Sequence, residues 1–179
     1  MNKQTIIEQL DIHYAEFSHL LSTLNAADYN AALQGKWSAG QQLDHLCKSV
    51  APVNMAFGLP GFVLQLFFGK ANRPSLGFED LVKKYQAKLA AGGRASKQFI
   101  PEKAEWEARA KLLRRLDHLS AELRLKIEKT AENQLDIYIL PHPLLGKITL
   151  REMLYFTIYH VQHHQNLVLG NPELRSGEI

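Results

Sequence analysis

The chain has almost none of the cysteine that would cross-link a fold. Of its 179 residues one is a cysteine, Cys47, which excludes an internal disulfide framework and zinc sites built from several cysteines. A single thiol is typical of a reducing compartment, so we expect a cytoplasmic protein. Because a chain of this length buries a sizeable core without staples, we expect one domain over residues 1–179 and a functional role for any bound metal.

The sequence also lacks an excess of one charge and an unbroken apolar run. Its 21 basic and 18 acidic side chains give a formal net charge of +3, which is too balanced to predict a nucleic-acid partner on its own. The apolar stretch from Val50 to Phe68 is interrupted by Pro52, Asn54 and Gly58, so we expect no membrane span. The first residues run directly into an amphipathic pattern, and we expect no signal peptide.

What the sequence does contain is helical periodicity in four long segments. Apolar side chains recur at steps of three and four in the ranges Ile7–Leu24, Leu43–Val53, Trp106–Ile127 and Leu150–Val168. Segments of this length and pattern predict an all-α protein, a four-helix bundle in which each apolar seam faces the others.

Two sequence signals indicate where bundle helices begin. Ser38 with Gln41, and Thr149 with Glu152, have the spacing of a capping box. The second bundle helix is therefore predicted to begin at Ala39, and the fourth directly after Thr149.

The connections between these helices also carry predictions. The pattern Phe78–Leu89 predicts a small helical insertion between the second and third bundle helices. Pro52 predicts a bend or an end in the second helix, and Pro101 is expected to open the third. Residues 135–140 alternate like a short extended segment, and the proline-rich residues 141–146 are expected to form a rigid connector.

Three histidines in five positions suggest a metal site near the end of the chain. On a helix, His160 and His164 project from one face, and two such nitrogens can hold one ion. A catalytic zinc typically has three protein ligands and one open position, and His45 on the second helix is the best-placed third ligand. His163 follows His160 by three residues and is an alternative to His164.

Most other polar residues that could bind a ligand are expected to lie on the protein surface. The remaining histidines have no helical partner and are predicted to be exposed or locally hydrogen-bonded: His13, His19, His118 and His142. The basic residues of the third helix are interspersed with acids, which predicts a solvated face: Lys111, Arg114, Arg115, Arg124, Lys126 and Lys129. Asp44 and Glu152 are interpreted as surface or capping carboxylates, although either could assist a metal site.

Three motifs give the sequence a resemblance to a known family. Lys36–Leu46, with its Trp-Ser start and His-Leu end, resembles the first signature of the DinB/YfiT-like metalloenzymes of the DinB superfamily. Pro143–Thr149 and Tyr159–Asn166 are similar to its second and third signatures. The resemblance spans positions 5–170, and it implies a four-helix bundle.

The resemblance also implies a metal site and a range of reactions. Family members bind a divalent ion, often zinc or nickel, through three histidines that match His45, His160 and His164. Relatives include thiol S-transferases and a mycothiol-dependent isomerase, so we expect a metal-dependent S-transferase or hydrolase. Its partner would be a small-molecule substrate such as a low-molecular-weight thiol. The alternatives are a non-catalytic metal-binding or stress-response module and, third, a nucleic-acid-binding protein.

The apolar stretch after His45 is expected to wall a pocket beside the metal. It emerges within one or two helical turns of His45, and Phe62, Leu66 and Phe67 are predicted to supply the apolar surface. Alternatively, these side chains pack on the bundle or bury the contact of a homodimer.

Overall fold

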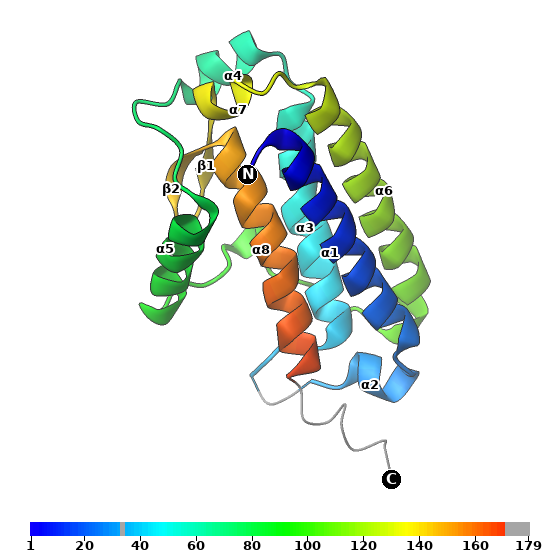
Figure 1. The fold of residues 1–179 in the computed structure, drawn as a ribbon. Helices are drawn as coiled ribbons and strands as arrows, with labels where there is room; N and C mark the ends of the chain where they lie inside the picture. The colour runs from blue at the N-terminus through cyan, green and yellow to red at the C-terminus, as the bar shows by residue number, and fades with distance from the viewer. Residues whose placement is uncertain (33–34, 171–179) are drawn as a thin grey trace.

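Four long helices form the body of the protein. The computed structural model describes residues 1–32 and 35–170 (Figure 1). Helices α3 and α1 each lie against the other two long helices, which closes a four-helix bundle. The predicted all-α bundle is thus confirmed, with these bounds: α1 Lys3–Thr23, α3 Ala39–Phe57, α6 Arg109–Lys129 and α8 Leu150–Leu169.

The sequence signals for these helices act as expected. The apolar seam of α1 is buried throughout: Ile7, Leu10, Tyr14, Phe17 and Leu21. Both capping boxes form, so α3 begins at Ala39 and α8 follows Thr149. Each box satisfies backbone donors at the first turn, and it thereby fixes the register of a helix that carries candidate ligands.

Shorter helices fill the connections. The insertion between α3 and α6 holds α5, which packs against α8, and three shorter pieces. Pro101 precedes α6 by several residues and a single 3₁₀ turn lies between them, so the prediction that this proline opens the helix is wrong. The bounds are α2 Ala26–Asn30, α4 Gly61–Phe68, α5 Phe78–Ala90, η1 Lys97–Phe99 and η2 Trp106–Ala108.

A small hairpin replaces the predicted rigid connector. Strands β1 (Ile139–His142) and β2 (Gly146–Thr149) pair antiparallel, with Pro141 opposite Lys147. The expected extended segment is wrong in its first half, because α7 (Gln134–Ile137) makes one helical turn before β1 begins. The hairpin leads straight into α8, so it places the first turn of that helix.

The apolar stretch after His45 divides into two helices. Helix α3 contains Pro52 and ends at Phe57, and α4 then turns away by 114°. Phe62, Leu66 and Phe67 are 73%, 77% and 71% exposed on α4, so the prediction that they wall a pocket is wrong. These three side chains lie on the solvent-facing side of this short helix, whose one buried residue is Leu64. Among the described residues no single helix is both long and apolar enough to cross a membrane, although α3 and α4 meet that test as a bent pair.

Candidate metal centre

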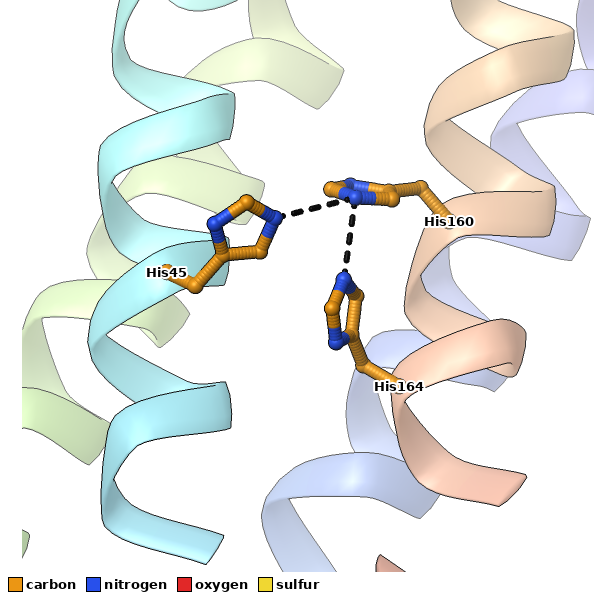
Figure 2. Close-up of side chains that lie close together, drawn as sticks. All are labelled: His45, His160 and His164. Carbon is orange, nitrogen blue, oxygen red and sulfur yellow. Dashed lines mark hydrogen bonds between the residues drawn. The ribbon is translucent and has the colours of Figure 1, made fainter. Parts of the chain in front are cut away.

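Three buried histidines converge between two bundle helices. His45 projects from α3 toward His160 and His164, which lie one turn apart on α8 (Figure 2). Nε2 of His160 is 3.1 Å from Nε2 of His45 and 3.0 Å from Nε2 of His164. One ring nitrogen of each residue lies within 4.8 Å of the other two, and all three side chains are buried. The structure therefore brings together the three predicted ligands.

Hydrogen bonds at the outer nitrogens orient two of the rings. Nδ1 of His45 lies 2.6 Å from the carbonyl oxygen of Phe99, which can only accept, so this nitrogen carries the proton. Nδ1 of His164 donates in the same way to Oε1 of Gln42. Each bond leaves the lone pair on Nε2, the atom that faces the centre of the cluster. Partners of this kind fix the tautomer and ring direction of metal-binding histidines.

Burial keeps the three imidazoles neutral. Desolvation lowers the pKa of His45 below its ordinary value, although the Phe99 carbonyl opposes the shift. The pKa values of His160 and His164 fall well below the usual range, first because both rings are buried and then because the other histidines lie nearby. Neutral imidazole is the form that binds metals.

These contacts fit a bound cation better than a metal-free cluster. Nε2 of His45 and Nε2 of His164 both present lone pairs to Nε2 of His160. A neutral His160 carries at most one proton on that nitrogen and can donate to only one of the two neighbours. At least one close pair of nitrogens is therefore left without a proton between them. A divalent ion accepts all three lone pairs at once, and the cluster could hold one.

The Gln42 contact yields a direct prediction. Gln42→Leu keeps the volume of the side chain but removes the acceptor for Nδ1 of His164. We expect the affinity for a divalent ion to fall about 10- to 100-fold, as for other outer hydrogen-bond partners of metal ligands. The control is Gln86→Leu, because Gln86 is exposed and bonds only Tyr159 among the described side chains. Competition titration with a chromophoric chelator measures both, and equal affinities would contradict the orienting role.

The other histidines lie outside the cluster. His163, the alternative to His164, stacks on Tyr159 with ring centroids 6.0 Å apart and is not part of the three-nitrogen group. His142 was predicted to be exposed or locally hydrogen-bonded; it is locally hydrogen-bonded, and it is buried instead of exposed. Its Nδ1 accepts from the backbone N–H groups of Leu144 and Leu145, and burial lowers its pKa to about 4.

The carboxylates of Asp44 and Glu152 are bound by other groups and not by the histidines. Asp44 accepts hydrogen bonds from the Glu102 backbone N–H at 3.0 Å and from Lys48 at 2.9 Å. Glu152 is fully buried and is held by Arg73 at the start of α8. In the described structure neither carboxylate hydrogen-bonds to a cluster histidine, so neither is assigned to the site.

A large cavity opens beside the histidine cluster. Its volume is about 910 Å³, within the range of small-molecule sites, and all three histidines line it. Trp37 forms part of its wall and has its ring centroid 4.9 Å from that of His45 and 6.3 Å from that of His164. The C-terminal part of α3, the turn after it and the end of α4 supply an apolar wall, as expected of the stretch after His45: Pro52, Val53, Met55, Ala56, Leu59 and Phe68.

Comparisons with known proteins give one match. The sequence model of the DinB superfamily matches residues 9–168, which is most of the chain and includes all three clustered histidines. No curated protein and no solved structure matches the sequence.

Proposed function

Because the chain belongs to the DinB superfamily, we propose that it is a divalent-metal-dependent enzyme whose ion is held by His45, His160 and His164. One observation carries the proposal: three Nε2 atoms meet where a cavity of about 910 Å³ reaches the bundle core. Zinc and nickel are the ions we propose, since both suit imidazole ligands. Three protein ligands leave a position for a further group, as in catalytic sites.

The protein's own residues would prepare this site for chemistry. A bound zinc or nickel ion supplies a positive centre that favours the deprotonated, nucleophilic form of water or of a thiol. The Phe99 carbonyl and Gln42 hold two of the rings in position before any ligand arrives. Phe156 stacks on His160 with centroids 4.7 Å apart and, with Trp37, keeps bulk water from the rings.

We propose that the reaction is attack by a small nucleophile on an electrophilic substrate in the cavity, in which the bond to the nucleophile forms as the bond to the leaving group breaks and the leaving group departs with the electron pair. We favour transfer of a group to or from a low-molecular-weight thiol. In the alternative, hydrolysis, water replaces the thiol as the nucleophile. The predominantly apolar wall supports the first, because a thiolate is a softer, less hydrated nucleophile and tolerates an environment with little water. The partner in either case is a small molecule.

The test is a substrate screen on metal-loaded protein. Zinc- or nickel-loaded chain is supplied with several low-molecular-weight thiols and a chlorodinitrobenzene electrophile, and in parallel with simple ester and amide substrates. Turnover above that of His160→Ala in the thiol panel supports thiol transfer, and turnover in the second panel supports hydrolysis. If neither panel exceeds the variant, the non-catalytic metal-binding module replaces the enzyme.

Metal removal is predicted to leave the fold intact. The apolar seams of the four long helices are buried without any contribution from an ion, and the chain is longer than domains that need a metal staple. Circular dichroism before and after dialysis against a chelator should show the same helical signal. Loss of most of that signal at 25 °C would show that the ion is structural.

A nucleic acid and a second copy of the chain are the remaining candidate partners. We propose that α6 binds no nucleic acid, because Arg124 pairs with Asp11 and Glu128, and Lys126 pairs with Glu122. These acids offset the charge that phosphates would need. A homodimer is one of the alternatives that the sequence leaves open for the apolar side chains after His45, and light scattering on the purified chain would test it.

A further inference from the structure

The polar residues of the cavity are unevenly distributed. Of the described residues that line it, none is an aspartate or a glutamate, whereas Lys36 and Arg94 both contribute. Neither cation forms an ion pair within the described structure, and the one hydrogen bond that Arg94 donates goes to the adjacent Gly93 carbonyl. Both side chains are exposed, so the rim of the cavity carries two positive charges without an acidic partner among the described residues, and the described lining holds no negative side chain.

One short segment gathers hydrogen-bond donors on the same wall. Arg94, Ser96 and Gln98 all line the cavity within five positions of one another. The Ser96 hydroxyl is buried and has no hydrogen-bond partner in the described residues. A buried polar group left in this state is unfavourable, and a hydrogen-bond acceptor on a ligand would relieve that cost. Three donors without a neighbouring carboxylate suit an anion.

This segment is tied to the histidine cluster. It runs into Phe99, whose carbonyl oxygen lies 2.6 Å from Nδ1 of His45. Five residues of extended chain span at most about 18 Å, so Arg94 lies within the reach of one small molecule from the cluster. Much of the remaining lining of the cavity is apolar, with Val53 and Ala56 from α3 and Leu144 from the hairpin turn.

We propose that the cavity binds an amphipathic acid, a substrate with a long apolar body and an anionic end group that Arg94 holds, with Lys36 as a second cation of the same lining. The apolar body lies along the α3 wall, and the part that reacts lies at the histidines. This inference deepens the proposed function and rests on it, because it names the substrate class of the same site. The selectivity for charge comes from the protein's own cations, so it is expected with or without the ion.

The experiment measures binding of three probes with one chain length: decanoate, decyltrimethylammonium and decanol. Isothermal titration calorimetry is run on chelated and on zinc-loaded protein. Decanoate should bind chelated protein about tenfold more tightly than decyltrimethylammonium, a difference of about 1.4 kcal/mol. Arg94→Gln and Lys36→Gln should each weaken decanoate about 3- to 10-fold and leave decanol unchanged. Arg114→Gln is the matched control, since Arg114 is exposed on α6 and does not line the cavity.

A second pair of variants tests the location. Ala56→Phe fills part of the α3 wall and Leu144→Trp narrows the cavity at the hairpin turn, and whichever variant folds should weaken binding of all probes that enter. Equal binding of decanoate and decyltrimethylammonium to chelated protein would overturn the proposal, as would an anion preference that appears only with zinc. Failure of the enzyme proposal is seen separately, because the probes bind without turnover.

Discussion

His160→Ala is expected to lower the affinity for zinc or nickel more than about 100-fold, because loss of an outer partner alone costs 10- to 100-fold. His160 is the residue that joins the cluster, since its Nε2 contacts both of the other Nε2 atoms. Its removal leaves two nitrogens on different helices with no third donor between them. Metal content of the purified variant and competition titration with a chelator measure the effect.

The control for this variant is His163→Ala on the same helix. His163 is partly exposed, stacks on Tyr159 and lies outside the three-nitrogen group. Its replacement should change metal affinity by less than about threefold, while His164→Ala should behave like His160→Ala. Normal metal content in His164→Ala together with loss in His163→Ala would transfer the third ligand to His163.

Glu152→Gln is expected to destabilise the fold by about 2–4 kcal/mol. The Glu152 carboxylate is completely buried and accepts hydrogen bonds from Arg73 at 2.6 and 3.0 Å and from the backbone N–H groups of Leu76 and Thr149. It therefore joins the first turn of α8 to the loop that precedes α5. The expected loss of stability is smaller than for a fully buried ion pair, because the Arg73 side chain is 37% exposed and stays partly solvated. Urea unfolding at pH 7 gives the value.

The Glu152 carboxylate is also expected to make the stability of the fold depend on pH. Burial raises the pKa of Glu152, but the bonds from Arg73, Leu76 and Thr149 together outweigh burial, so its pKa lies below the ordinary 4.5. A lowered pKa means that this stability is present above pH 4.5 and is lost as the pH falls through the folded-state pKa. Glu152→Gln should flatten this part of the profile. Glu8→Gln, at an exposed site on α1, should change stability by less than about 0.5 kcal/mol, and an equal loss in both variants would contradict the anchoring role.

Much of the fold and of the cluster follows from local sequence patterns. The spacing of residue types predicts the four long helices and their two capping boxes. It also predicts the two ligands on α8, because His160 and His164 are one helical turn apart. The Gln42 contact had a usable signal, since Gln42 and His45 are three residues apart on one helix face. These features depend on periodicity alone.

Contacts that depend on tertiary structure could not be predicted in this way. The Phe99 carbonyl reaches His45 across 54 positions, and a backbone oxygen has no signature in the sequence. His142 is buried because the hairpin turns it inward against Phe156, with ring centroids 4.2 Å apart. The outward direction of Phe67 follows from the 114° turn between α3 and α4, which the spacing of apolar residues does not contain.

X-ray absorption at the zinc edge of reconstituted protein tests the metal centre most directly. The three-histidine site predicts one zinc per chain with three imidazole nitrogens at about 2.0–2.1 Å, one oxygen ligand and no sulfur. The thiol of Cys47 is buried and lies beside the Leu112 carbonyl, so it is not expected among the ligands. A spectrum that contains sulfur, or fewer than three imidazoles, would contradict a zinc site formed by His45, His160 and His164.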